Sequence, residues 1–311
     1  MNLEASNPDW PSLVWFGSQR SEGVAVLEFF TAEIRNANTR RAYAQAAGQF
    51  AAWAAERGLE LKTLTAPHLA AYIEQRMKGL STPSVKMHLA ALRSLLDSLV
   101  RRGVLPYNPA SSVRAPRYSA ERGKTPIMAG EEMRILFESI GSQSSKDLRD
   151  RALLSVMIYG FARVGAVVKM KMEDYYEAEQ RQWFRFYEKN GKRHEVPVHR
   201  EAAASLEAWI AVGPKGADRK APLFPSMKDY SHPLNPNDVL RMIKRRGKAI
   251  GLSSGICCHS FRATGITLYL EGGGTLEKAQ RLAAHSSPRT TKLYDRSADN
   301  LSTSDLERIR F

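Results

Sequence analysis

Apolar positions follow a helical period through residues 24–113. Between residues 38 and 58 they recur at intervals of three and four, which places one apolar stripe along a helix; these positions are Tyr43, Ala47, Phe50, Ala51 and Ala54. Asn38 or Thr39 can cap the start of this helix, and Gly58 can end it. The pattern predicts a helix that buries one face.

Two further helix starts follow in the same region. Pro67 comes just after Thr65, and Pro83 comes just after Ser81 and Thr82, as expected for proline in the first helical turn. The second of these helices carries a leucine stripe and stops at Gly103. About four helices therefore predict a small all-α domain over residues 22–112, and residues 1–21, which lack a period, predict an irregular N-terminal arm.

Beyond residue 126 the pattern is mixed. Residues 148–159 are helical in period, whereas residues 183–188 and 193–198 alternate around Asn190 and Gly191, a strong hairpin signal. Helical stretches follow at 202–212, 237–250, 262–270 and 276–284. The chain is therefore predicted to be mainly α with a small β-hairpin or sheet, and residues 126–311 to form an α+β domain.

The two domains are joined by a basic, proline-containing segment. Residues 107–126 hold three prolines, four arginine or lysine side chains and one acid. We predict a linker over residues 113–125. Its charge fits a chain that crosses a phosphate backbone and fits an ordinary solvated linker equally well.

Composition narrows the choice of partner. Lys and Arg number 46 and Asp and Glu 32, so the formal net charge is +14 and favours a nucleic-acid partner. An acidic membrane surface is disfavoured because no apolar run approaches the roughly 18 residues of a membrane span. The first 20 residues lack the features of a secretory signal, and the two cysteines cannot form a disulfide framework. We expect a cytoplasmic protein associated with the nucleoid.

Several common site types are absent from the sequence. There is no GxxxxGK[ST] loop for a nucleotide. Cys257, Cys258 and His259 are adjacent, which makes a poor chelate, and no second Cys or His pair lies at zinc spacing. The sequence therefore predicts neither a metal nor a cofactor.

Dispersed basic residues and one tyrosine remain as candidates. His259 and Arg262 are three positions apart and share a helical face. Tyr294 follows His285 by nine residues and is expected on the second turn of a helix that starts near Pro288. Each of these residues, taken alone, has an ordinary structural explanation.

Two more cations lie upstream. Arg163 is flanked by apolar residues, where burial of its charge would require an anion. Lys189 lies at the edge of the predicted hairpin turn. Taken alone, Arg163 is better explained by a salt bridge at the edge of the core, and Lys189 by a solvated charge in a turn.

The order of these residues along the chain resembles the tyrosine recombinase family, the phage-type integrases that include Xer-like and Cre-like enzymes. The set is Arg163, Lys189, His259, Arg262, His285 and Tyr294. The motifs HSFRATG (259–265) and LAAHSSPRTTKLYDR (282–296) carry most of the resemblance, which covers nearly the whole chain beyond the arm. It implies a helical core-binding, SAM-like domain followed by a catalytic domain.

The sequence departs from the family pattern at two positions. The family usually has a supporting carboxylate three residues after its first arginine, where this chain has Ala166. The usual Leu-Gly-His is here Ala283-Ala284-His285. Lys192 is a second lysine on the hairpin, and counting back from its end favours Lys189.

The resemblance implies DNA cleavage and rejoining without a metal. Tyr294 would attack the scissile phosphate, and Arg163, Arg262 and His285 would stabilise the phosphoryl oxygens. His259 would assist deprotonation of the tyrosine, and Lys189 would protonate the leaving 5′ oxygen. The resemblance also implies a homotetramer on double-stranded DNA, joined through the C-terminal tail, and the ending KLYDR favours a mobile-element integrase.

Two alternatives stay open at this point. A type IB topoisomerase would use the same chemistry without strand exchange, and relaxation of supercoiled DNA without a specific site would identify it. A catalytically silent DNA-binding protein could share the scaffold, and a covalent protein–DNA adduct would exclude it.

Overall fold

The computed structural model describes residues 15–16, 20–118, 123–188, 191–214 and 218–295. The chain divides into two compact units, Met1–Ser119 and Ala120–Phe311. In the described part of the chain, no helix combines the length and apolarity needed to cross a membrane.

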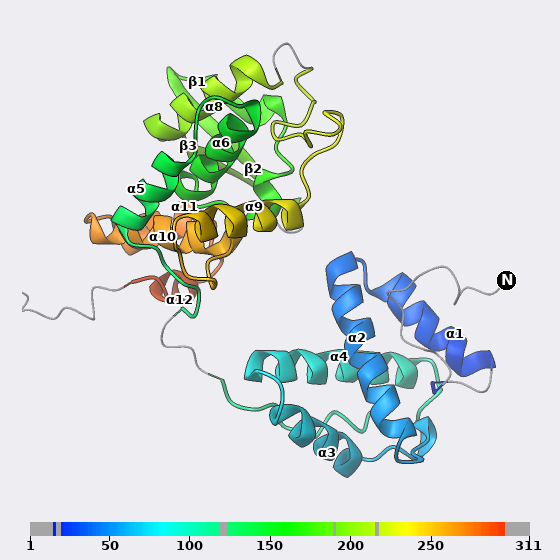
Figure 1. Cartoon of the computed structure of the whole chain (residues 1–311). Helices are drawn as coiled ribbons and strands as arrows, with labels where there is room; N and C mark the ends of the chain where they lie inside the picture. Colours follow the sequence, from blue (N-terminus) through cyan, green and yellow to red (C-terminus); the bar gives the residue numbers. More distant parts are fainter. Residues whose placement is uncertain (1–14, 17–19, 119–122, 189–190, 215–217, 296–311) are drawn as a thin grey trace, which may run out of the picture. The chain divides into compact units, whose positions relative to one another are not determined.

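The first unit is all-α, as predicted (Figure 1). Its elements are α1 (Arg20–Glu28), which continues into the π-helical segment η2 (Phe29–Glu33), then α2 (Ala37–Ala55), the short η3 (Leu61–Thr63), α3 (Ala66–Met77) and α4 (Thr82–Arg101). The predicted starts at Thr65 and Ser81 are confirmed as N-caps. The cap of α2 was predicted wrongly: it is Asn36, whose side chain accepts from the backbone N–H groups of Asn38 and Thr39.

Aromatic side chains fill the core of this unit. Phe50 of α2 lies in edge contact with Tyr72 of α3 and with Trp15, and both Phe50 and Tyr72 are fully buried. Phe16 is buried in the same core, and the indole N–H of Trp15 donates to the Leu59 carbonyl at 2.8 Å. The two aromatic residues from the segment predicted as irregular therefore belong to the core, because they supply apolar area.

The second unit combines helices with one small sheet. Its elements are α5 (Gly130–Ser139), α6 (Ser145–Tyr159), α7 (Val164–Val167), η4 (Met172–Asp174), β1 (Tyr175–Ala178), β2 (Arg181–Tyr187), β3 (Arg193–Pro197), α8 (Arg200–Val212), α9 (Pro236–Ala249), α10 (Cys258–Glu271), α11 (Leu276–Leu282) and α12 (Pro288–Lys292). The sheet is antiparallel in the order β1-β2-β3. The β2–β3 hairpin was predicted, and β1 was missed because Glu179 and Gln180 adopt positive φ in its turn without a glycine to mark it.

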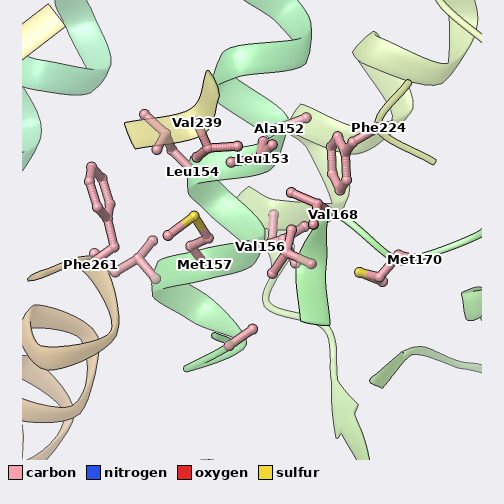
Figure 2. Close-up of a cluster of buried hydrophobic side chains, with 14 of the residues drawn as sticks. Ala152, Leu153, Leu154, Val156, Met157, Val168, Met170, Phe224, Val239 and Phe261 are labelled. Atoms are coloured by element: carbon pink, nitrogen blue, oxygen red, sulfur yellow. The ribbon is translucent and has the colours of Figure 1, made fainter. Parts of the chain in front are cut away.

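Helix α6 is the centre of the core of this unit. Leu153, Val156 and Met157 are fully buried, and Figure 2 shows them surrounded by side chains from other elements, among them Phe224, Val239 and Phe261. On the sheet side, Phe184 and Phe186 of β2 point into the same core. The buried helix therefore provides a fixed support for α10 and for the loop after α6.

Gly265 allows α10 to lie close against the end of α6. A Cβ atom at this position would lie 2.3 Å from the Ile158 carbonyl oxygen, closer than any side chain can approach. The glycine of HSFRATG is therefore a packing requirement. Because of this close approach, the side chains of the first turns of α10 meet the Phe161 segment.

Candidate active site

Arg262 is the buried cation of the site. It projects from α10, is 1% exposed, and donates to the backbone carbonyls of Phe161 and Ala283, the latter at 2.5 Å. Its Nε has no hydrogen-bond partner. The two hydrogen bonds use two of the five N–H groups of the guanidinium, so this buried positive charge keeps donor capacity for an anion.

Tyr294 and His259 form a direct pair. The hydroxyl of Tyr294 lies 3.1 Å from Nε2 of His259, and Tyr294 is 6% exposed. The sequence predicted Tyr294 on the helix that starts at Pro288, and this was wrong, because α12 ends at Lys292. Tyr294 lies in the following turn, where its N–H donates to the Thr291 carbonyl. The Tyr294 carbonyl accepts from the hydroxyl of Thr267 on α10 at 3.2 Å, which ties this turn to the helix that carries His259.

His285 completes this side of the site. Its ring stacks on that of Tyr294, with centroids 5.9 Å apart and planes 10° apart. Its Nδ1 lies 2.8 Å from the hydroxyl of Thr291. This contact leaves Nε2 of the ring as the second hydrogen-bonding position.

Burial and the two arginines set the protonation states of these groups. Burial, and then the charges of Arg262 and Arg163, lower the pKa of His259, and the same causes lower the pKa of His285 to about 3. Burial raises the pKa of Tyr294 despite the opposing effect of both arginines. At neutral pH both histidines are therefore uncharged and the tyrosine hydroxyl is protonated, so the Nδ1–H tautomer of His259 presents Nε2 as an acceptor to that hydroxyl.

Arg163 was expected inside an apolar run and is instead exposed. Its side chain is 44% exposed, because the residue is the N-cap of the short α7 and lies outside the helix itself. Its Nη1 donates to a carboxylate oxygen of Glu188 at 2.5 Å. The anion that the sequence required for this cation is thus supplied by the end of the hairpin.

The hairpin is attached to the rest of the site through β3. Nε2 of His194 lies 2.9 Å from the carbonyl of Leu282, next to the Ala283 carbonyl that holds Arg262. Lys192 is exposed and lines, with His285, a cavity of about 590 Å³. Lys189 lies outside the described residues.

The two departures from the family pattern have structural consequences. Ala166 is buried at the third position of α7, from which a carboxylate would reach back toward the N-cap, Arg163. Ala284 adopts φ +48°, a left-handed conformation that favours glycine. The backbone conformation is therefore what distinguishes alanine from glycine at this position.

The structure brings five of the six predicted residues into one region of the second unit. Tyr294 contacts both His259 and His285, and Arg262 is held beside them by the Phe161 and Ala283 carbonyls. The charge of Arg163 acts on all four residues. Sequence reasoning missed Glu188 and Thr291, which contact Arg163 and His285. No spacing marked either residue, because each meets its partner only through the fold.

Comparison with known proteins gives one consistent result. The Phage integrase family matches residues 127–300, and the family's N-terminal SAM-like domain matches residues 29–103. The tyrosine recombinase XerC of Serratia marcescens is 30% identical over 216 residues, covering 70% of this chain and 69% of the relative. A tyrosine recombinase of Synechococcus elongatus is 28% identical over 286 residues, covering 87% and 88% of the two chains.

Solved structures share the fold. The site-specific recombinase XerH bound to its palindromic difH substrate gives a TM-score of 0.72 at 19% identity, covering 96% of this chain and 90% of that one. The lambda integrase dimer bound to a COC′ core site gives 0.67 at 20% identity, covering 90% and 79%. The chain therefore belongs to the phage integrase family, the tyrosine recombinases, and is an enzyme of site-specific recombination that cleaves and rejoins DNA.

Proposed function

We propose that Tyr294 is the nucleophile that cleaves DNA. Its hydroxyl attacks the scissile phosphate, a 3′-phosphotyrosyl bond forms, and the bond to the 5′ oxygen breaks. The phosphotyrosine conserves the bond energy, so the 5′ hydroxyl of a partner strand can later displace the tyrosine without ATP. The observation that carries this proposal is the contact between Tyr294 and the neutral His259, beside the buried charge of Arg262.

The other residues have distinct roles in the proposed reaction. His259 accepts the hydroxyl proton as the tyrosine attacks. Arg262 and Arg163, through guanidinium N–H groups that protein acceptors do not use, donate to the non-bridging oxygens, whose negative charge grows in the transition state. His285 adds a hydrogen bond from its free ring nitrogen. Lys189 gives a proton to the leaving 5′ oxygen.

The proposal is tested by trapping the covalent intermediate. A nicked DNA substrate, from which the cleaved 5′ fragment diffuses away, should accumulate protein–DNA adduct with the natural chain and none with Tyr294→Phe. The variant loses one hydroxyl and should bind DNA as tightly as the natural chain. Adduct formed by Tyr294→Phe would refute the assignment, and cleavage is expected to proceed unchanged in EDTA.

We further propose that four copies assemble on two duplexes and that the C-terminal tail joins them. The tail, residues 296–311, lies outside the described residues, and its sequence supplies Leu301, Leu306, Ile309 and Phe311. The catalytic unit offers a largely apolar cavity of about 790 Å³ between α5, α6, α8 and α10, which fits such a segment. Deleting residues 300–311 should preserve cleavage of a single site and abolish strand exchange; full exchange by the truncated chain would argue against this role.

The biological role we propose is integration and excision of a mobile element, in the cytoplasm and at the nucleoid. The support is the resemblance of the 292–296 segment to mobile-element integrases and the net charge of +14, which suits binding along duplex DNA. The core-binding domain, residues 22–112, and the catalytic domain, residues 126–311, would hold the duplex, with the 113–125 linker between them. Sequencing DNA trapped in the covalent complex tests this: sites at element ends support it, and a single chromosomal resolution site contradicts it.

A further inference from the structure

The contact between Glu188 and Arg163 is not explained by the roles given above. Glu188 follows the last residue of β2, and its carboxylate accepts from Nη1 of Arg163 at 2.5 Å. The Glu188 side chain is only 9% exposed, whereas that of Arg163 is 44% exposed. A carboxylate this far removed from water gives a stronger hydrogen bond than a surface pair does.

Arg163 has little else to hold it. It is the N-cap of a helix of four residues and makes no side-chain capping bond, and Ala166 cannot reach back to it. Among the described residues, Glu188 makes the one side-chain hydrogen bond to this guanidinium. Without Glu188 the exposed arginine would be free to change rotamer, at the expense of the orientation that a phosphate needs.

The geometry of the pair leaves Arg163 able to bind phosphate. Glu188 occupies Nη1 only, so the edge formed by Nε and Nη2 stays available to two oxygens. The carboxylate also opposes the repulsion between the two arginines, since its charge favours the protonated form of Arg262 while that of Arg163 disfavours it. Both effects assemble the cationic site before DNA arrives.

Glu188 also belongs to the hairpin. Its N–H donates to the Lys192 carbonyl at 2.9 Å, and its own carbonyl accepts from the N–H of Gly191 at 3.1 Å. The residue thus closes the turn that carries Lys189. These backbone bonds persist whatever the side chain is, so a side-chain substitution tests the contact with Arg163 alone.

We infer that Glu188 is a positioning residue for Arg163 and performs, from the hairpin, the supporting role that a carboxylate at position 166 would perform from α7. The inference rests on the proposed role of Arg163 in holding the scissile phosphate. The opposite possibility is that Glu188 competes with phosphate for Arg163. Removing the carboxylate charge should lower the cleavage rate if Glu188 positions Arg163, and raise it if Glu188 competes.

The test is single-turnover cleavage by the full chain carrying Glu188→Gln, Arg163→Ala or both. Glu188→Gln should lower the cleavage rate constant by about 10-fold to 100-fold, the scale for a misplaced catalytic group, with the dissociation constant for DNA within twofold and the melting temperature unchanged. In the Arg163→Ala background the same substitution should change the rate less than twofold. Glu177→Gln, on the exposed part of β1, is the matched control and should match the natural chain.

A substrate with sulfur in place of the bridging 5′ oxygen separates Arg163 from the proton donor. The better leaving group also keeps the rate of Arg163→Ala measurable. The Glu188→Gln defect should persist on this substrate; its disappearance would mean that Glu188 acts through the hairpin lysine and would overturn the inference. A rate equal to or above that of the natural chain, or an equal loss with and without Arg163, would also overturn it. If the natural chain forms no adduct, the proposed function fails instead.

Discussion

The active site has two halves that are held in different ways. The helix-10 half consists of Arg262, His259, His285 and Tyr294; three of these are under 8% exposed, and bonds to backbone or neighbouring side chains fix all four. The hairpin half consists of Arg163, Glu188 and the hairpin lysines, and there the described contact to Arg163 is one ion pair beside solvent. One half is therefore set by the core, and in the other the arginine is open to solvent.

This difference follows from what each half must do. In the proposed reaction Tyr294 and His259 need a fixed distance, which their 3.1 Å contact supplies. Burial limits the solvation of Tyr294, whereas His259 itself is exposed. The groups that meet the substrate's charged oxygens and leaving group must stay accessible until DNA binds. The two halves are therefore expected to differ in chemistry and in their share of the fold's stability.

The largest effect is expected in the hairpin half. Lys189→Ala should lower cleavage by about 10²–10⁴-fold, because an alkoxide leaves poorly without a proton. A bridging 5′ sulfur leaves as a thiolate and should restore the rate of Lys189→Ala, while Arg163→Ala stays impaired. Lys192→Ala is the control, with a mild loss and no special recovery; if it is the variant that sulfur rescues, the two lysines exchange roles.

The two arginines should respond differently to the same substitution. Arg262→Lys should lower cleavage by about 10²–10³-fold and the free energy of unfolding by about 1–3 kcal/mol, since one ammonium cannot satisfy carbonyls on two segments. Arg163→Lys should impair cleavage and leave thermal melting within the range of the natural chain, because its site is exposed. Equal losses of stability in the two variants would remove the distinction between the halves.

The fall of the cleavage rate at acid pH should depend on His259 and not on His285. Because its pKa lies below the ordinary 6.5, the neutral form that accepts the tyrosine proton dominates above pH 6.5, and cleavage falls as pH drops through the lowered pKa. His259→Gln should lower the rate about 10²-fold at neutral pH and lose this acid limb. His285→Gln should retain the limb, since the pKa of His285, near 3, keeps it neutral from pH 5 to 8. A limb that disappears with His285 would reverse the two roles.

The smallest effect concerns the backbone of the helix-10 half. Ala284→Gly should raise the free energy of unfolding by about 1 kcal/mol, because φ +48° strains alanine and not glycine. Ala283→Gly, at a neighbouring position of ordinary φ, should instead destabilise the fold. Thermal melting of both variants measures the difference, and a destabilised Ala284→Gly would show that the methyl group matters more than the strain.

Several features were predictable because they depend on neighbours in the chain. The helix starts at Thr65 and Ser81 and the antiparallel pairing of β2 with β3 follow from local capping and turn preferences. The cap at Asn36 was missed because Asn38 and Thr39, just after it, are residue types that also cap helices. Strand β1 was missed because the turn that follows it contains no glycine. Tyr294 was placed on α12 because a five-residue helix cannot be told from a longer one by period.

The sequence by itself determined the class of chemistry and the set of candidate reacting groups, because the order of these residues and the two C-terminal motifs can be read along the chain. Only the tertiary structure decided that Arg262 and not Arg163 is the buried arginine, that Glu188 is the partner of Arg163, and that Thr291 orients His285. Burial and pairing depend on contacts between residues far apart in the chain: Arg163 and Glu188 are 25 positions apart, and Phe161 and Arg262 are 101 apart. No local preference encodes such contacts; they arise when α10 packs on α6 and the hairpin closes over α7.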